Sequence, residues 1–322
     1  MGRPPFRFAV QATNAASAHE WRDTALKVQD LGYATLFLAD HYLGPGPAQR
    51  AARTPRQDLA PIAAMAAAAT VTETLRIGCR VFCVDYHLPA VLAKEAATLD
   101  LLSDGRLELG IGAGWSADEY AALGVPFDRP QRRIAKLREV IGLLRAHFSG
   151  TEIDCAGEFV NVQGYAGRPR PVQRPYPPIM VGGGGRRVLS LAAQEADIVS
   201  ISNVPFIARN EAGLDPQAEA RRRIGYVRAA AGDRYGALEV ESSPYFVDVT
   251  EDTQAALANL ASRTGIAPEV LRDHPNVLIG SGETIAETLL SRREVLGVNY
   301  VTVQQAHVDA FAGVVAKLSG RG

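Results

Sequence analysis

Short apolar segments alternate with amphipathic segments along almost the whole chain, and this alternation constrains the fold more than any other feature. The segments with strand character are 6–11, 34–40, 75–84, 105–114, 178–185, 197–202, 237–250 and 299–304. Strands that are apolar on both faces and alternate with helices indicate a parallel sheet covered by helices. A doubly wound open sheet is the rival arrangement. Eight such units, with no linker or change of composition between them, favour closure into a (β/α)8 TIM barrel.

The length of the chain fits this architecture. The 322 residues are 47% hydrophobic, which supports a large core, and α/β barrels of about 250 residues or more form single domains. We therefore expect one domain over residues 1–322. The segment 124–177 is too long for a simple connection, so we expect it to hold a long helix, "RPQRRIAKLREVIGLLRAHF", and an insertion after the fourth strand.

Charge and cysteine content limit the classes of ligand and partner that we expect this chain to bind. The chain carries 34 basic and 35 acidic residues, a net charge of -1, so no global field attracts nucleic acid or anionic lipid. Cys79, Cys83 and Cys155 have no CxxC spacing, which argues against a disulfide framework and a zinc site. The N-terminal residues lack the apolar stretch of a signal peptide or membrane span. We expect a cytoplasmic protein with a small-molecule substrate.

The stretch "LFLADHY" (36–42) turns abruptly from apolar to ionisable residues at a predicted strand end. Catalytic groups of closed parallel barrels gather at such ends. His41, with an ordinary pKa of about 6.5, is suited to acid/base work. The alternative is that Asp40 caps the following turn and His41 is merely exposed. His87 lies on the same predicted rim but could simply lead into the next helix.

Other chemistries of barrels are not favoured. All four lysines fall in predicted helices, whereas Schiff-base aldolases need a lysine at a strand end. The first strand, "FAVQAT", lacks the His-x-His of metal-dependent barrel hydrolases, so Asp40, His41, Asp85 and His87 are not expected to bind a metal.

Two glycine-rich segments follow predicted strands. The run "GGGG" lies between the apolar "PIMV" and the helical "RRVLSLAAQEA". Its backbone N–H groups and the positive end of the helix are suited to a phosphate, with Arg186 or Arg187 adding charge; a plain flexible turn is the alternative. The second segment, "GIGAG" (110–114), lacks the third glycine of the dinucleotide fingerprint, so a Rossmann site is not predicted.

Several motifs occur in one order: "LGYATLFLADH", "LRIGCRVF", "HLPAVLAKEAATLDLLSDGRLELGIGAGWSADEYAALG", "RPYPPIMVGGGG" and "LAAQEADIV". Together they resemble the bacterial luciferase-like superfamily, and in particular its coenzyme F420-dependent oxidoreductase branch. The resemblance covers about residues 6–200 and continues more loosely in "IAETLLSRREVLGVNYVTVQ". The block "LDLLSDGRLELGIGAGW" is its most specific part.

The resemblance implies that the cofactor ring lies at the C-terminal ends of the strands and that the glycine run holds the phosphate. It matches His41 to the active-site histidine of the family and Asp40 to its neighbour close to the ring. It also implies a bulge behind the ring, with a non-proline cis peptide at Arg80–Val81. The implied cofactor-binding residues are Asp40, Cys79, Arg80, Val81, Gly112, Gly114, Gly182, Gly183, Gly184, Gly185 and Arg186.

One position departs from the family pattern. Trp115 stands where the sugar-phosphate dehydrogenases of this branch carry a catalytic glutamate, so that activity is not expected. Trp115 could line an apolar substrate pocket with Tyr42, Phe82 and Tyr86, or it could be a plain packing residue. The pocket interpretation predicts a hydrophobic or aromatic substrate.

Three functions follow from the resemblance. With F420, the protein would transfer a hydride and His41 would act as an acid/base or orienting group. With FMN, it would be a monooxygenase; a cofactor-binding protein without turnover is the third alternative. The Arg-rich stretch 167–174, able to meet an anionic tail, is a secondary indication of F420. Dimers are common in the family, so a homodimer is expected.

Overall fold

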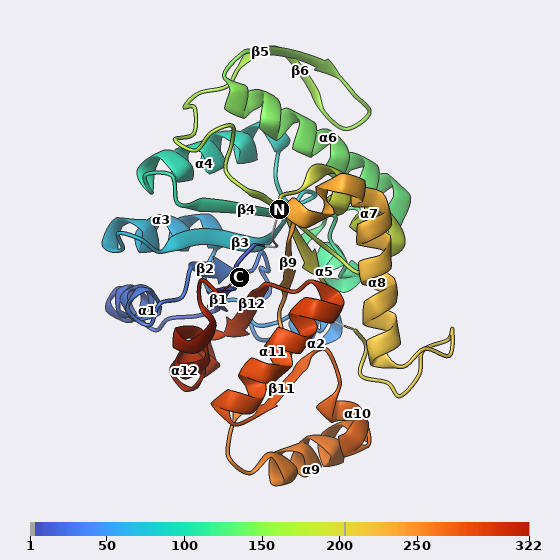
Figure 1. Ribbon diagram of the computed structural model, residues 1–322. Helices are drawn as coiled ribbons and strands as arrows, with labels where there is room; N and C mark the ends of the chain where they lie inside the picture. Colours follow the sequence, from blue (N-terminus) through green and yellow to red (C-terminus); the bar gives the residue numbers. More distant parts are fainter. Residues whose placement is uncertain (1–3, 203, 322) are drawn as a thin grey trace. The chain divides into compact units, whose positions relative to one another are not determined.

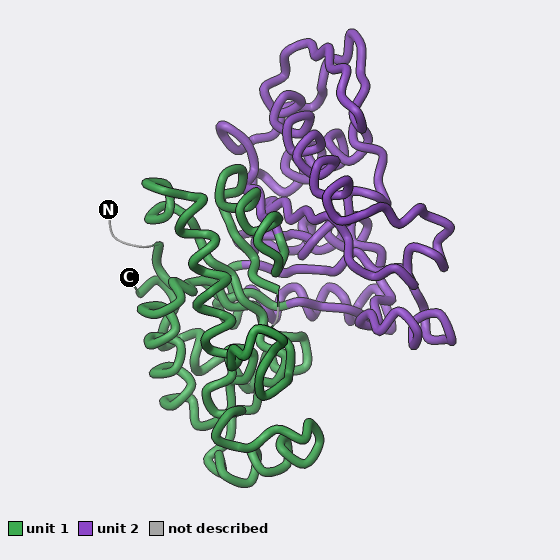
Figure 2. Tube along the Cα trace, turned by 90° about the vertical axis from the view of Figure 1, so that its right-hand side faces the viewer, with its two compact units in different colours: residues 1–10, 30–34, 182–322 green, residues 11–29, 35–181 purple. Residues whose placement is uncertain are grey.

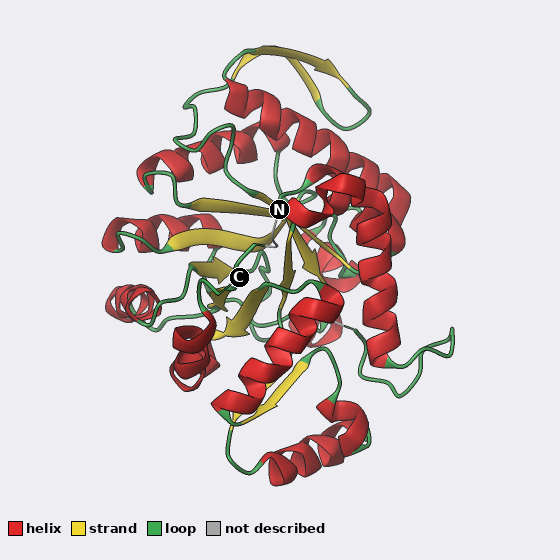
Figure 3. Ribbon diagram, in the orientation of Figure 1, coloured by secondary structure: helices red, strands yellow, loops and turns green. Residues whose placement is uncertain are grey.

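The computed structural model describes residues 4–202 and 204–321, and these contain a closed barrel of eight parallel strands. The predicted (β/α)8 fold is thereby confirmed. Around the barrel the strands follow the order β1-β12-β9-β8-β7-β4-β3-β2, and Figure 3 shows the alternation of strands and helices. The barrel strands are β1 Arg7–Gln11, β2 Thr35–Leu38, β3 Arg76–Cys83, β4 Leu107–Gly112, β7 Ile179–Gly183, β8 Ile198–Ile201, β9 Glu239–Ser242 and β12 Tyr300–Gln304.

Helices connect most of these strands, as labelled in Figure 1. They are α1 Ala18–Asp30, α2 Pro47–Ala52, α3 Pro61–Val71, α4 Pro89–Leu102, α5 Ala117–Leu123, α6 Pro130–Ser149, α7 Arg186–Glu195, α8 Pro216–Ala231, α9 Thr253–Thr264, α10 Pro268–Arg272, α11 Gly282–Leu296 and α12 Val308–Leu318, with two 3-10 turns, Gly232–Ala237 and Gln305–His307.

Local sequence signals set many element boundaries. The Ser17 hydroxyl accepts from the backbone N–H of Glu20, and the Glu20 carboxylate accepts from the N–H of Ala16, which is a reciprocal capping arrangement at the start of α1. Prolines occupy the first turn of α3, α4, α6 and α8, where a missing N–H costs nothing. All four residues of β2 are buried, as a strand covered on both faces requires.

The chain divides into two compact units, coloured separately in Figure 2. One consists of residues 11–29 and 35–181, and the other of residues 1–10, 30–34 and 182–322. The single domain predicted over 1–322 stays a prediction, and residues 1–3, 203 and 322 lie outside the described part. No helix among the described residues is long and apolar enough to span a bilayer.

The insertion after the fourth strand is present in the first unit. The 20-residue helix α6 is followed by an antiparallel hairpin of β5 Glu152–Ala156 and β6 Asn161–Ala166, which lies beyond α6 in Figure 1. The predicted long helix and insertion are therefore confirmed. The short helix α5, which precedes α6, was not predicted.

The second unit differs from the prediction at the segment 237–250. We expected one strand there, but the chain forms the barrel strand β9 and then a separate strand, β10 Phe246–Val249. Strand β10 pairs in parallel with β11 Val277–Gly280 outside the barrel. The proline-containing "SSPY" between β9 and β10 marks the break, because proline cannot donate a ladder hydrogen bond.

Candidate functional site

The chain after β2 carries a buried carboxylate that joins two strand ends. Asp40 is 3% exposed. Its Oδ2 accepts from the backbone N–H of Cys83 at 2.8 Å and lies 2.9 Å from Nε2 of His87, while its Oδ1 accepts from the Tyr42 hydroxyl at 2.8 Å. Both oxygens of Asp40 are thus engaged by the protein itself. The aspartate clamps the end of β2 to the end of β3, and its predicted contact with a cofactor stays a prediction.

The next residue, His41, is paired with a glutamate that the sequence interpretation missed. Its Nδ1 lies 2.7 Å from Oε2 of Glu119, a carboxylate that is 1% exposed. The other oxygen of Glu119 accepts from the backbone N–H of Tyr42 at 3.0 Å. Because an ionised carboxylate only accepts, the hydrogen of a neutral His41 ring is on Nδ1. Nε2, which has no partner among the described residues, then carries the basic lone pair.

Glu119 reaches His41 because of the short helix α5. Ser116 is its N-cap, and the Ser116 hydroxyl accepts from the Glu119 N–H. Gly124, with φ 71°, ends the helix. The spacing Ser-x-x-Glu is a capping-box signature and was the local signal available for this helix. The carboxylate, however, contacts a residue 78 positions earlier in the chain, and no local pattern reports such a contact.

Strand β3 has the predicted irregularity beside this pair. Its pairing with β4 shifts register between Cys79 and Phe82, and the Arg80–Val81 peptide is cis, as the resemblance implied. Cys79 is fully buried, and its predicted contact with a cofactor stays a prediction. The Arg80 guanidinium donates to Oε1 of Gln11 at 3.0 Å, which ties the bulge to the end of β1.

The predicted glycines at the end of β4 have a packing role. Gly112 accepts from the Val84 N–H at 3.1 Å. Gly114 has φ 71°, and a Cβ at this position would collide with the Tyr120 hydroxyl and approach the Cys83 sulfur to 2.9 Å. Only glycine fits such a left-handed, crowded position. These glycines shape the turn that presents Trp115 and Ser116; binding of a cofactor by Gly112 and Gly114 stays a prediction.

Aromatic side chains surround the histidine. The Trp115 indole is 59% exposed and meets the His41 ring edge-on, with 6.0 Å between centroids. Tyr42 is 41% exposed and contacts the Tyr86 ring at 6.1 Å. Phe82 is fully buried and packs against His87 at 5.2 Å, and its predicted place in a substrate pocket stays a prediction. The structure therefore exposes Trp115 and Tyr42 beside His41 and leaves Tyr86 half-buried against Tyr42, whereas Phe82 is buried against His87.

The hydroxyls of these tyrosines stay protonated. Burial, followed by the charge of Asp40, raises the pKa of Tyr42, and burial followed by the charge of Glu119 raises the pKa of Tyr86. Neutral phenols can donate hydrogen bonds at physiological pH. The Tyr42 proton is donated to Asp40 and Tyr86 is hydrogen-bonded to Glu119, so these hydroxyls offer a bound ligand an acceptor oxygen rather than a proton.

A second polar group lies behind the aromatic residues. Asp85 accepts from Nζ of Lys136 and from the buried hydroxyl of Tyr120, both at 2.7 Å. The Tyr120 oxygen is also 3.0 Å from the sulfur of Cys83. Burial raises the pKa of Cys83 to about 11, so the thiol is not a nucleophile at neutral pH. Asp85 is thus neutralised by Lys136 and does not join a cluster with His41 and His87.

The glycine run belongs to the other compact unit and is described by itself. Gly182 and Gly183 end β7, and Gly185 is the N-cap of α7. A Cβ at Gly184 would lie 2.8 Å from Nη1 of Arg223, a cation of α8 that the sequence interpretation missed. Arg186 lies over the ring of Tyr226 at 5.8 Å. The predicted strand–glycine–helix context is present, and phosphate binding stays a prediction.

Sequence comparisons find three informative relatives. An uncharacterised protein of Mycobacterium tuberculosis is 36% identical over 164 residues, covering 48% of this chain and 57% of the relative. An F420-dependent glucose-6-phosphate dehydrogenase of Kineococcus radiotolerans is 30% identical over 61% of this chain and 54% of the relative. An FMNH2-dependent dimethylsulfone monooxygenase of Pseudomonas putida is 27% identical, and the match covers 54% of this chain and 46% of the relative. The chain spans about half the length of these curated relatives.

Solved structures agree on the fold. The coenzyme F420-dependent tetrahydromethanopterin reductase of Methanopyrus kandleri superposes with a TM-score of 0.74 at 16% identity, covering 98% of both chains. A monooxygenase of Streptomyces bottropensis gives the same TM-score at 20% identity, covering 97% of this chain and 98% of the other. The family model described as luciferase-like monooxygenase matches residues 4–276. With most of its length matched, and with the barrel, the bulge in β3 and the hairpin after β4 in place, the chain belongs to the luciferase-like monooxygenase family.

Proposed function

We propose that this protein is an oxidoreductase that uses coenzyme F420 to exchange a hydride with a small, mainly hydrophobic organic substrate. The observation that carries the proposal is the pair of His41 and buried Glu119, with a donor–acceptor distance of 2.7 Å. This pair leaves Nε2 of the histidine as the atom for chemistry, next to exposed aromatic side chains.

In this proposal His41 moves a proton at the substrate. When the carbon of an alcohol loses a hydride, its hydroxyl must also lose a proton to give the carbonyl compound; in the reverse direction the carbonyl carbon gains the hydride and its oxygen gains a proton. Nε2 of His41 can accept or donate that proton, and the Glu119 carboxylate stabilises the imidazolium that forms and holds the ring in one orientation. Asp40 positions this pair indirectly, because it clamps the strand end from which His41 projects.

The residues present fit a phosphate-bearing cofactor. Gly185, the N-cap of α7, has nothing within 4 Å of its Cβ position, so the start of the helix is open, whereas the space beside Gly183 and Gly184 is filled by Val188 and Arg223. The N–H groups at the start of that helix, with Arg186, would hold a phosphate, whereas the Arg223 guanidinium is already paired with Glu219 at 2.8 Å and donates to the carbonyl of Ser202. F420 when bound supplies a ring that accepts or donates a hydride. By the family resemblance, Arg80 and Val81 would form the wall behind this ring.

Relatives of both cofactor classes are found, so the preference for F420 comes from the resemblance of the sequence motifs to the F420-dependent branch. The F420-dependent relative is 30% identical to this chain and the FMNH2-dependent one is 27% identical. The Arg-rich stretch 167–174 adds little, because the Arg170 and Arg174 guanidiniums donate to the carbonyls of Ser149 and Pro171. FMN-dependent oxygenation is the alternative function, and both cofactors offer a phosphate to the same glycines.

The side chains around His41 support a hydrophobic or aromatic substrate. Trp115 and Tyr42 are the exposed aromatic residues beside it, and neither carries a formal charge. Large exposed aromatic side chains on a monomer's surface usually mark binding sites. The uncharged Trp115, in place of a glutamate, also argues against a sugar phosphate as the substrate.

A binding titration tests the cofactor. Purified protein is titrated with F420 and, separately, with FMN, and quenching of cofactor fluorescence is recorded. The proposal expects saturable quenching of F420 and none of FMN. The reverse result would refute hydride transfer by F420 and support the monooxygenase. A protein that binds F420 but reduces or oxidises no member of a panel of aliphatic and aromatic alcohols and ketones would support the role of a binding protein.

Variants test the histidine. His41→Ala should bind F420 like the unchanged protein but turn over the best member of the panel at least about a hundredfold more slowly, as loss of a general acid/base does. His19→Ala is the matched control, because His19 is exposed and pairs with Asp23 on its own helix. Equal turnover by both variants would remove His41 from the mechanism. The homodimer expected from the resemblance stays a prediction, which light scattering can check.

A further inference from the structure

The second unit contains a small module outside the barrel, inserted between β9 and α11. It consists of β10, β11, α9 and α10, and the two helices lie beside β11 in Figure 1. The module has its own apolar cluster, formed by Leu257, Leu260, Ile266, Leu271 and Val277. A satellite core of this kind indicates a segment that packs as a unit of its own.

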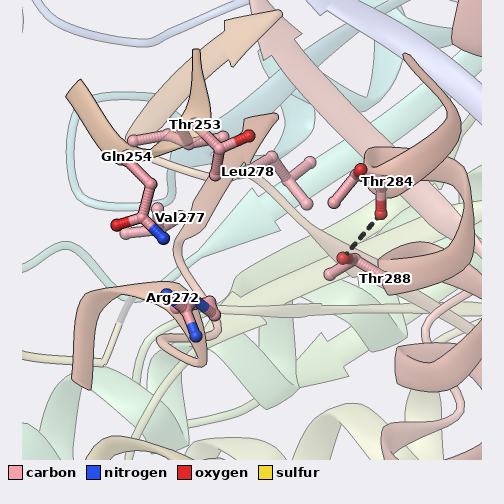
Figure 4. Close-up of a pocket in the computed structure, with 8 residues that line it drawn as sticks. Thr253, Gln254, Arg272, Val277, Leu278, Thr284 and Thr288 are labelled. Atoms are coloured by element: carbon pink, nitrogen blue, oxygen red, sulfur yellow. Dashed lines mark hydrogen bonds between the residues drawn. The ribbon is translucent and has the colours of Figure 1, made fainter. Parts of the chain in front are cut away.

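This module carries a pocket of about 290 Å³ that the proposed oxidoreductase function does not use. Its lining residues come from the start of α9, the end of α10, strand β11 and the first turns of α11: Thr253, Gln254, Arg272, Val277, Leu278, Ile279, Thr284 and Thr288. Figure 4 shows Gln254 and Arg272 on one side of the pocket and Thr284 and Thr288 on the other. The backbone and side chains of β11 supply its apolar surface.

The polar groups of the pocket differ in their availability. Thr288 donates to the carbonyl of Thr284 at 2.8 Å, so its hydroxyl proton is used. Within residues 4–202 and 204–321, the side chains of Thr253, Gln254 and Arg272 make no hydrogen bond or ion pair. Three donors from two elements, the end of α10 and the start of α9, are therefore available to one ligand.

The charge of the pocket is positive. Arg272 is the one ionisable residue among its lining residues. Two neighbouring carboxylates have partners of their own: Asp252 accepts from the N–H of Ala255 at the start of α9, and Asp273 lies near the buried Arg292, whose pKa burial lowers to about 10 although the charge of Asp273 opposes this shift. An arginine with available hydroxyl and amide donors suits a carboxylate or phosphate group, and the apolar strand beside it suits a hydrocarbon.

We propose that this pocket binds a small organic carboxylate, with the anionic group on Arg272, Gln254 and Thr253 and a short apolar body along Val277–Ile279. All residues of the site belong to the second unit, and the proposed binding does not involve the cofactor. A phosphate without an apolar body would use only the polar part of the pocket, so it should bind more weakly than a carboxylate that has a hydrocarbon chain.

The test uses the full-length protein and calorimetric titration with hexanoate, 1-hexanol and inorganic phosphate. Hexanoate should bind with one site per chain, and 1-hexanol and phosphate should each bind at least about tenfold more weakly, a difference of about 1.4 kcal/mol. Arg272→Gln should weaken hexanoate binding by about tenfold or more. Arg221→Gln is the control, because Arg221 is an exposed arginine on α8 whose guanidinium contacts Gln217 on the same helix.

A second variant distinguishes loss of hexanoate binding from loss of folding. Gln254→Trp at the exposed start of α9 should fill the pocket and abolish hexanoate binding while the unfolding midpoint stays unchanged. Absence of hexanoate binding to the unchanged protein would overturn the proposal, and so would binding that neither Arg272→Gln nor Gln254→Trp weakens. Phosphate that binds as tightly as hexanoate would overturn the role of the apolar body. Because none of these measurements involves F420, they are independent of the outcome for the oxidoreductase function.

Discussion

Replacement of Asp40 by alanine should destabilise the protein strongly, because this carboxylate is the acceptor that joins the ends of β2 and β3. Its three donors are the Cys83 N–H, the His87 ring and the Tyr42 hydroxyl. The tyrosine is 41% exposed, so its hydroxyl can turn to water. The other two donors are buried or nearly so, and each would be left without an acceptor at a cost of about 1–3 kcal/mol. We expect the free energy of unfolding to fall by about 3–5 kcal/mol in total.

Urea unfolding followed by circular dichroism measures this loss, as a shift of the midpoint at constant slope. Asp58→Ala is the control, because Asp58 forms an exposed pair with Arg56 and should lose at most about 1 kcal/mol. Hydrogen exchange at the Cys83 amide should accelerate in the Asp40 variant and not in the control. If Asp40→Ala lost no more free energy of unfolding than the control, the hypothesis that Asp40 joins the two strand ends would be refuted, and the carboxylate would be available to a cofactor.

Three further outcomes are expected. Glu119→Gln keeps the shape but removes the charge beside His41, so kcat/KM with F420 and substrate should fall about ten- to a hundredfold at unchanged F420 affinity; an unaltered kcat/KM would contradict the pairing. Burial lowers the pKa of His274 to about 4, below its value of about 6.5 in the unfolded chain. Its contribution to stability is therefore complete above about pH 6.5 and is lost as pH falls towards 4, by roughly 3 kcal/mol. His274→Gln should flatten this slope in urea unfolding measured across that range, and an identical slope would show that other groups cause it. Gly114→Ala should lose about 2–4 kcal/mol in thermal unfolding because both its φ and its crowding oppose a side chain, whereas Gly124→Ala, with φ 71° but nothing within 4 Å, should lose only about 1 kcal/mol.

Much of the fold was predictable because the signals are local. A strand buried on both faces must be apolar at consecutive positions, and a helix against the sheet must repeat its apolar residues every three to four positions. The segment 237–250 was predicted less well. Its two strands, β9 and β10, are each four residues long and each mix apolar with acidic residues. Their pairing partners, β8 and β12 for β9 and β11 for β10, distinguish them.

The candidate site was predictable only in part. A polar residue after a buried strand in a parallel barrel must lie on the rim, so His41 could be located from its position alone. Its partner could not, because Glu119 is 78 residues away and the spacing of Ser116 and Glu119 indicates only a helix start. Phe82 illustrates the opposite case, since an aromatic residue at a strand end can face a pocket or the core, and packing against His87 placed it in the core.

By itself, then, the sequence determined the barrel, its insertion, the rim position of His41 and the strand–glycine–helix context of Gly182 to Gly185. These depend on periodicity, turn residues and strand ends, which are properties of neighbouring residues. The tertiary structure decided that Asp40 is a clamp, that Glu119 orients His41, and that a pocket opens beside Arg272. Each of these depends on side chains brought together from distant segments, and the distances between them are set by the packing of whole elements.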